Sequence, residues 1–381
     1  MDLLRFLIPK PERVECSICG RSSEKISRAI GVCVNCIRTE PEKALASGKL
    51  AHMSSRKSFD LPSSPPRNQH GVKCKICANA CEIPINRKGF CGLRTNEHGK
   101  LRHLAGTPSK GILECYHDPL PTNCVADWVC PGATGCGYPK YSYKKGEPEY
   151  GYNNLAVFYG ACTFDCLFCQ NWHYRLLTKD LSPSMSAEEL ASKVNENTSC
   201  ICYFGGDPTA QLPHAIKASR IAIETNKNRI LRICWESNGT MMPSYLKTIA
   251  EISMKSGGCI KIDLKVWDES LNQILCGASN RQTIKNIEFL AEYGKKRKEP
   301  PFLVVSTLLV PGYVDAEEVE KIAKFLASLD PGIPYSLLAF HPDFEMDDMP
   351  TTSKKDAMEC MNVAKKAGLE KVRIGNIHLL A

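Results

Sequence analysis

Twenty-one cysteines in a chain of 381 residues constrain this protein more than any other feature of its sequence. Most fall in four close sets: Cys16, Cys19, Cys33 and Cys36; Cys74, Cys77, Cys81 and Cys91; Cys115, Cys124, Cys130 and Cys136; and Cys162, Cys166 and Cys169. Disulfide scaffolds are typical of short secreted chains, whereas grouped thiols in a long chain without a signal-peptide pattern favour metal binding in a reducing compartment. We therefore expect a cytoplasmic metalloprotein.

The remaining cysteines lie mostly in apolar runs, where cysteine behaves as a small buried hydrophobe. They are Cys200, Cys202, Cys234, Cys259, Cys276 and Cys360. We predict no metal role for them.

The first set has the two paired Cys-x-x-Cys turns typical of a zinc ribbon or treble clef, which close a tetrahedron around one ion. It predicts a small zinc module over residues 1–51 that binds a partner or braces the fold. Residues 52–70 are rich in Ser, Pro and charge, the composition of a linker.

Residues 71–151 are rich in Cys, Gly and Pro and predict a loop-rich extension organised by metal. The sets beginning at Cys74 and Cys115 each suit a closed four-thiolate site holding zinc or an auxiliary iron–sulfur cluster. We expect this extension to lie near the open mouth of the domain that follows it.

From residue 152 onward, short apolar runs alternate with amphipathic segments of helical length. This alternation predicts an α/β domain over residues 152–381, with a parallel sheet and crossover helices. Six such units suggest a partial (β/α)6 barrel, in which chemistry sits at the loops that follow the strands. The expected strands are 155–159, 200–204, 230–235, 260–264, 302–310 and 335–340, and the expected helices are 186–195, 212–225, 244–255, 281–293, 316–329 and 354–367.

The loop after the first of these strands reads Cys162-Thr-Phe-Asp-Cys166-Leu-Phe168-Cys169. Three thiolates on one loop can ligate three irons of a four-iron cluster and leave the fourth iron open. A zinc knuckle is the alternative, which three cysteines without a fourth ligand suit poorly. The pattern resembles radical S-adenosylmethionine (SAM) proteins, in the version found in pyruvate formate-lyase activating enzyme. The resemblance implies a [4Fe-4S] cluster that binds SAM at its open iron, with Phe168 against the adenine.

Other strand ends extend the resemblance. Gly205-Gly206-Asp207-Pro208 is similar to a turn that receives the methionine amino group of SAM, and Asp stands here where that family has Glu. Asn238 and Lys265 stand where the family contacts SAM, Glu236 and Asp263 where its acids bind a monovalent cation, and His341 where it has a SAM or substrate contact. The Cys74 to Cys91 segment resembles the leading part of activase-like proteins called AmmeMemoRadiSam.

The resemblance implies reductive cleavage of SAM to a 5′-deoxyadenosyl radical that abstracts hydrogen from a protein or peptide, as glycyl-radical activases do. A flavodoxin, ferredoxin or other reductase would supply the electron. Radical methylation, or another modification of a small molecule or RNA, is the close alternative. A zinc-rich scaffold with a degenerate barrel is the alternative without catalysis, and the intact cysteine loop argues against it.

The formal net charge of +8 does not by itself indicate nucleic acid, because the basic residues are spread along the chain in short clusters such as residues 295–298. Apolar runs fall short of the roughly 20 residues of a membrane helix, so we expect no membrane association.

Overall fold

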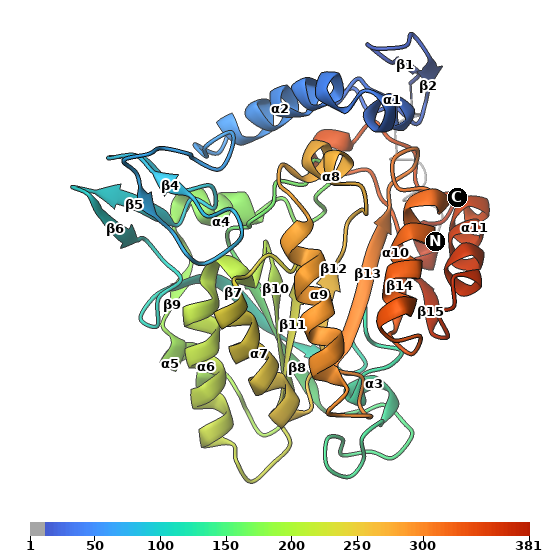
Figure 1. Cartoon of the computed structure of the whole chain (residues 1–381). Helices are drawn as coiled ribbons and strands as arrows, with labels where there is room; N and C mark the ends of the chain where they lie inside the picture. Colours follow the sequence, from blue (N-terminus) through green and yellow to red (C-terminus); the bar gives the residue numbers. More distant parts are fainter. Residues whose placement is uncertain (1–11) are drawn as a thin grey trace.

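The computed structural model describes residues 12–381 and is built around one open nine-stranded sheet (Figure 1). The strands, in their spatial order, are β15 (Val372–Gly375), β14 (Tyr335–Ala339), β13 (Leu303–Leu309), β12 (Ile260–Asp263), β11 (Arg232–Ser237), β10 (Thr198–Gly205), β8 (Asn153–Tyr159), β7 (Gly111–Pro119) and β9 (Ser184–Met185). Strands β15 through β8 pair in parallel, whereas β7 pairs antiparallel with both β8 and β9. The predicted α/β class and open barrel are confirmed, with β7, β9 and β15 added to the six expected strands.

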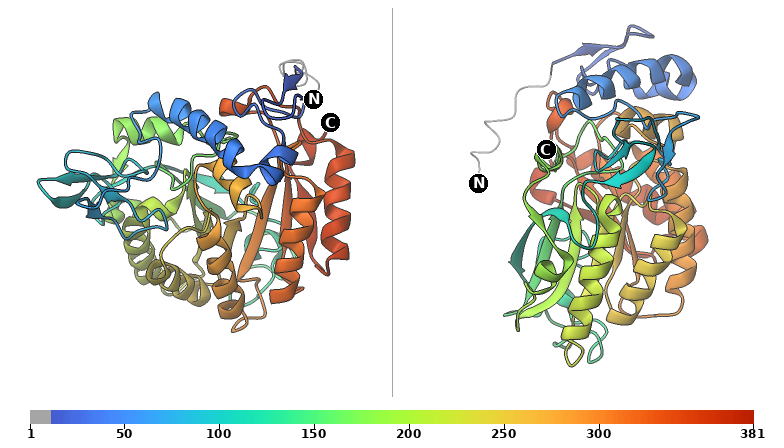
Figure 2. Two further views of the ribbon diagram at one scale, coloured as in Figure 1. Left: turned by 45° about the horizontal axis from the view of Figure 1, so that its top comes forward. Right: turned by 90° about the vertical axis from the view of Figure 1, so that its left-hand side faces the viewer.

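Amphipathic helices cover the outer face of this sheet and connect its parallel strands (Figures 1 and 2). They are α5 (Ala187–Ala191), α6 (Leu212–Thr225), α7 (Pro243–Ser256), α9 (Arg281–Gly294), α10 (Ala316–Leu329) and α11 (Lys354–Lys366), whereas α4 (Tyr174–Asp180) and α8 (Glu269–Cys276) lie at the carboxyl ends of the strands. Short 3₁₀ turns occupy Pro208–Gln211, Phe344–Met346 and Ile377–Leu379.

The two faces of the sheet differ in chemistry because side chains alternate along each strand. On β10, Ile201 and Tyr203 lie in the main hydrophobic core with the outer helices. Cys200 and Cys202 point to the inner, concave face instead, where they line a cavity. The inner face is therefore where a site can form.

The N-terminal segment lies across the carboxyl ends of the strands (Figure 2). It consists of a small hairpin, β1 (Val14–Glu15) with β2 (Ser22–Ser23), and the helices α1 (Val34–Thr39) and α2 (Pro41–Lys57). Helix α2 continues into the segment predicted as a linker. The first eleven residues of the predicted 1–51 module lie outside the described residues.

The extension predicted over 71–151 divides between the two ends of the sheet. Two short hairpins lie beside α4 (Figure 1); they are β3 (Val72–Lys73) with β4 (Glu82–Ile83), and β5 (Arg94–Glu97) with β6 (Lys100–His103). Strand β7 belongs to the central sheet. Residues 131–151, with α3 (Pro131–Thr134), lie under the amino ends of the strands, whereas Asn123 and Val125 line the same cavity as Cys162, at the end where we expected the extension.

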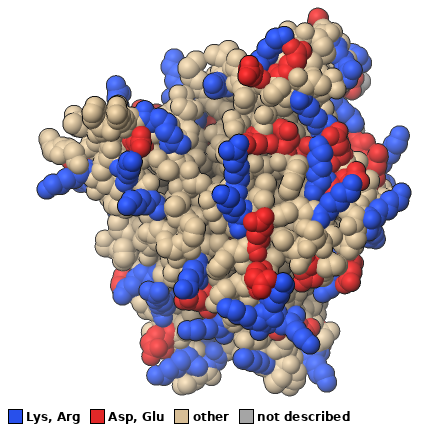
Figure 3. Space-filling view, viewed as in Figure 1, with Lys and Arg blue, Asp and Glu red and all other residues tan. Residues whose placement is uncertain are grey.

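None of the helices formed by residues 12–381 has the length and apolar character needed to cross a bilayer. On the face drawn in Figure 3, basic and acidic side chains are interspersed.

Candidate functional site

The three cysteines of the loop after β8 line one cavity of about 490 Å³, a volume within the range of small-molecule sites. The carboxyl ends of neighbouring parallel strands meet at the same edge, so motifs far apart in sequence converge there. Besides Cys162, Cys166 and Cys169, the lining includes Phe168, Gly205, Gly206, Asp207, Glu236, Asn238, Asp263 and Lys265. The structure thus brings these sequence-predicted residues together.

The two glycines after β10 let its turn pack against the cysteine loop. A Cβ on Gly206 would lie 2.2 Å from the carbonyl oxygen of Ala161, and Gly205 has a φ of +111°. The Gly206 amide donates to Tyr159 O at 2.8 Å, and the Asp207 amide donates to Ala161 O at 2.9 Å. Close contact with the loop therefore accounts for glycine at 206, and the positive φ together with close contact to Tyr159 of β8 accounts for glycine at 205.

Asp207 is a buried carboxylate that organises the ends of β10 and β11. It accepts hydrogen bonds from the amides of Asn238 and Thr209, both at 2.7 Å, and from Ser237 Oγ at 3.0 Å. Burial raises its pKa although these donors oppose the rise. Asn238 is thereby held with its side-chain nitrogen, Nδ2, 3.7 Å from the Cys162 sulfur.

Two lysine–carboxylate pairs line the inner face below the loop. Lys265 Nζ lies 2.8 Å from Asp263, and Lys261 Nζ lies 2.8 Å from Glu236. Burial alone would lower the pKa of Lys265, but the Asp263 carboxylate raises it. Because each acid is neutralised by its own ammonium group, the geometry gives no support to the predicted monovalent-cation site at Glu236 and Asp263.

The surroundings of the loop thiols favour their neutral form. Hydrogen bonding of the Cys166 thiol to Cys276, together with burial, raises the pKa of Cys166, and burial raises the pKa of Cys162 and, to about 11, that of Cys169. Metal binding deprotonates thiols. Three soft sulfur donors around a cavity, with no fourth protein thiol lining it, fit a cluster with one open iron.

Asp165, inside the cysteine loop, is a functional candidate that sequence reasoning missed. His52 Nδ1 lies 2.9 Å from its carboxylate, Ser55 Oγ donates at 2.8 Å, Arg56 lies at 3.2 Å and Arg175 donates at 2.7 Å. Three of these four residues come from α2. The sequence around Asp165 gives no sign of its partners, because α2 is more than a hundred residues away in the sequence and only the fold brings it to Asp165.

The expected contact at His341 is not found, because His341 does not line the cavity and instead lies 3.1 Å from Asp343. Asn376 and His378, directly after β15, line the cavity in its place. Sequence reasoning missed them because it missed β15. A short apolar run followed by Gly-Asn-Ile-His was the available signal.

The first cysteine set is the one group within residues 12–381 whose candidate ligand atoms all lie within 4.8 Å of one another. Cys19 and Cys33 sulfurs are 3.8 Å apart, about the spacing of a tetrahedron with Zn–S bonds of about 2.3 Å. Burial would raise the pKa of Cys16, but backbone amides beginning with that of Cys33 lower it to about 6. The set can therefore hold a single tetrahedral ion.

The second set, Cys74, Cys77, Cys81 and Cys91, lines one small cavity under the loop that contains Thr163. Burial raises the pKa of Cys81 to about 12, and burial also raises that of Cys74 and Cys77. The four thiols converge, at wider spacing than those of the first set.

The third predicted set is not a single site. Cys115 on β7 pairs with Val157 and packs against the outer hydrophobic core. Cys124 and Cys130 lie on the inner face of the sheet, whereas Cys136 donates to Val129 O at 3.1 Å. The spacing of these cysteines in the sequence does not reveal that Cys115 on β7 points to the opposite face of the sheet from Cys124 and Cys130.

Comparison with known proteins agrees with this site. The family model described as the radical SAM superfamily matches residues 156–326. A protein of Methanocaldococcus jannaschii named only as uncharacterized is 25% identical over 311 residues, covering 80% of this chain and 81% of that protein. A provisionally named glycyl-radical enzyme activating enzyme of the same organism is 32% identical over 187 residues, covering 47% of this chain and 64% of that protein.

Pyruvate formate-lyase 1-activating enzyme of Escherichia coli K12 is 23% identical over 191 residues, covering 49% of this chain and 73% of that enzyme. The cysteine loop and most of the strands that line the cavity fall within the segment matched by the family model. The candidate site therefore lies in the part of this chain that matches the radical SAM superfamily, residues 156–326.

Proposed function

We propose that this protein is an enzyme that cleaves SAM reductively at a [4Fe-4S] cluster held by Cys162, Cys166 and Cys169. The observation that carries the proposal is the meeting of these three thiols with Asp207, Asn238 and Lys265 around one cavity. A scaffold with a degenerate barrel would have no reason to retain that combination.

When bound, the cluster and SAM supply reductive cleavage to methionine and a 5′-deoxyadenosyl radical. The chain's own residues hold and orient the reactants. Lys265 offers an ammonium group for a carboxylate. Phe168, buried beside Cys166, offers an aromatic face. Asp207 fixes the backbone around Asn238, and the apolar side chains Leu308 and Leu338 help to exclude water from the opposite wall.

For the substrate we propose a protein or peptide from which hydrogen is abstracted, with a reductase, flavodoxin or ferredoxin as electron donor. Support comes from the relatives named as activating enzymes. We further propose that zinc occupies the Cys16 set, which has the spacing of a single-ion site.

The test is 5′-deoxyadenosine production by anaerobic, dithionite-reduced protein. We expect Cys166→Ala to lose the cluster and all SAM cleavage, because two thiolates cannot replace a three-point attachment. Cys360→Ala is the matched control, a buried cysteine on α11 outside the cavity, and should keep full activity. Undiminished cleavage by Cys166→Ala would remove the role assigned to the loop.

A further inference from the structure

The inner face of the half-barrel is lined with thiols at the amino ends of its strands. Barrel interiors are ordinarily filled by branched aliphatic side chains. Here Cys200 and Cys202 on β10, Cys234 on β11 and Cys259 before β12 point inward, while the residues between them, such as Ile201 and Ile233, point to the outer core. The alternation that suggested buried hydrophobes in the sequence instead gathers these cysteines on one face.

Two further cysteines complete this lining from below. Cys124 and Cys130, in the segment that crosses under the strands, join the four barrel cysteines around one cavity of about 50 Å³. That is room for several water molecules, whereas closely packed hydrophobic cores contain few voids larger than one water. If these six cysteines served only as small hydrophobic residues, we would expect them to pack together without such a space.

Cys234 on β11 and Cys259, directly before β12, lie side by side. The Cys259 amide donates a hydrogen bond to Cys234 Sγ at 3.5 Å. Cys130 and Cys200 line the same cavity as these two residues. Cys130, Cys200, Cys234 and Cys259 thus form one group around the cavity.

The other two thiols have a different partner. Lys261 Nζ donates to Cys202 Sγ at 3.0 Å and to Cys124 Sγ at 3.1 Å, in addition to its ion pair with Glu236. Since Glu236 also lines the SAM cavity, Lys261 connects the thiol cavity to that site.

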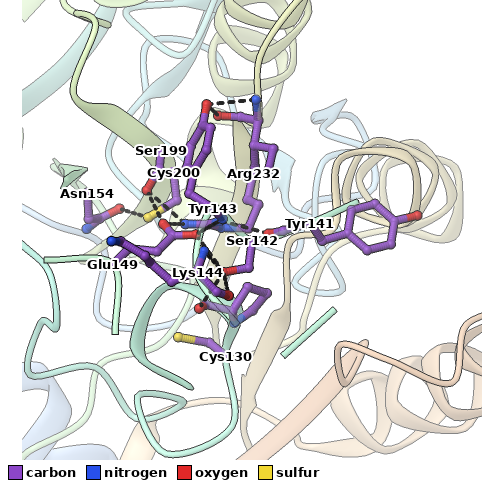
Figure 4. A network of polar contacts seen from close by, with 12 residues as sticks. Cys130, Tyr141, Ser142, Tyr143, Lys144, Glu149, Asn154, Ser199, Cys200 and Arg232 are labelled. Carbon is purple, nitrogen blue, oxygen red and sulfur yellow. Dashed lines mark hydrogen bonds and ion pairs between the residues drawn. The ribbon is translucent and has the colours of Figure 1, made fainter. Parts of the chain in front are cut away.

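A second buried cation lies at the base of the cavity. Arg232 makes two hydrogen bonds to Glu149, at 2.9 and 2.6 Å, and Cys130 and Cys200 lie close to this pair (Figure 4). Metal-bound thiolates carry negative charge that a low-dielectric interior would otherwise disfavour. Arg232 and Lys261 are placed to stabilise that charge.

The spacing of the thiols argues against a single tetrahedral ion in this cavity. Within residues 12–381, only the Cys16 set has its sulfurs within 4.8 Å of one another, and neither the Cys162 loop nor this cavity meets that spacing. We propose that Cys130, Cys200, Cys234 and Cys259 hold a second [4Fe-4S] cluster inside the barrel, below the SAM cavity. Soft thiolate donors suit iron–sulfur chemistry, and four of them leave no open iron.

The test uses a background chain in which the loop cysteines are removed by Cys162→Ala, Cys166→Ala and Cys169→Ala, so its outcome does not depend on the proposed function. To this chain we add either Cys234→Ala with Cys259→Ala, or the control pair Cys115→Ala with Cys360→Ala, both of which lie outside the cavity. After anaerobic reconstitution with iron and sulfide, the first pair should lower content by about four iron and four sulfide per chain, and the control pair by none. Mössbauer spectra should show the same loss.

Equal iron content in the chain with the cavity pair and the chain with the control pair would overturn the proposal. Loss of zinc without loss of iron would also overturn it, because the cavity would then hold a single ion rather than a cluster. If the variant with Cys234→Ala and Cys259→Ala is insoluble, a second variant tests the proposal. It is the background chain with Cys74→Ala and Cys77→Ala added. It keeps every cavity thiol and must still bind about four iron. An iron-free protein there would also overturn the proposal.

Discussion

The Asp165 carboxylate is the negative charge that balances the cationic side chains packed against the cysteine loop. Burial alone would raise its pKa, but the hydrogen bond from His52 and the charges of Arg56 and Arg175 hold it well below the ordinary value. Its backbone amide also donates to Cys276 O on α8 at 2.8 Å. Asp165, which lies between Cys162 and Cys166 in the loop, is thus fixed through both its side chain and its backbone.

We expect Asp165→Asn to lower the free energy of unfolding at pH 7 by about 3–5 kcal/mol, because it leaves buried cations without a counter-charge. Urea denaturation measures this, with Ser55→Ala, which removes one donor and costs about 1 kcal/mol, as control. An Asp with a depressed pKa stabilises fully above its unfolded pKa of about 4 and less as pH falls below it. The difference between wild type and Asp165→Asn should therefore shrink below about pH 4, and a constant difference would contradict the assignment.

His378 and His341 offer a direct comparison of structure with sequence. His378 lies on the cavity wall. We expect the His378→Ala variant to keep its iron but to have a KM for SAM about fivefold higher, because the loss of one hydrogen bond of about 1 kcal/mol corresponds to about a fivefold change. His341→Ala should leave that KM unchanged, since it lies outside the cavity. The reverse pattern in 5′-deoxyadenosine assays would favour the role implied by resemblance.

At the scale of elements, α2 connects the N-terminal segment to the cysteine loop. The composition of residues 52–70 predicts independent folding, whereas His52, Ser55 and Arg56 at the end of α2 contact Asp165. Tyr313, after β13, also accepts from the Ser27 amide and donates to Val32 O. These contacts predict that the segment braces the loop.

We expect a chain beginning at residue 61 to lose most of the iron of the Cys162 loop, and to produce at least about tenfold less 5′-deoxyadenosine. Three lost buried partners at about 1 kcal/mol or more each exceed the 1.4 kcal/mol of a tenfold change. Leu50→Ala with Met53→Ala, on the exposed face of the same helix, is the control and should retain iron and activity. Normal iron content in the truncated chain would show that the segment folds and acts apart.

Most of the barrel could be predicted from sequence because its periodicity is strong. The run at 155–159 lies in β8, and the segments at 212–225 and 316–329 coincide with α6 and α10. Helix α2 was missed because its sequence is polar with weak apolar periodicity, and its contacts are long-range. The loop motifs were found because ligand spacing is local, whereas Asp165 and the inward cysteines depend on which elements meet.

At the scale of the whole molecule, residues 120–130 join the two ends of the parallel part of the open sheet, from β8 to β14 and β15. The Leu120 amide donates to Tyr152 O at 2.9 Å, just before β8. Asp127 pairs with Arg373 on β15, and Trp128 Nε1 donates to Ser336 Oγ on β14 at 3.1 Å. A sheet that does not close by strand pairing is thus closed at its base by this crossing segment, which also carries Cys124 and Cys130.

If the crossing segment closes the barrel, Trp128→Ala should both destabilise the protein and expose the thiols above it. We expect a loss of about 3 kcal/mol in urea unfolding, because packing and a hydrogen bond disappear together, against about 1 kcal/mol for Trp128→Phe, which keeps the ring. In metal-free protein, Cys130 and Cys234 should react faster with a thiol reagent in Trp128→Ala than in Trp128→Phe. Cys360 is the internal reference, because it lies on α11, away from the base, and its rate should be the same in both. Equal stability and equal labelling in the two variants would mean that the segment only covers the base without closing it.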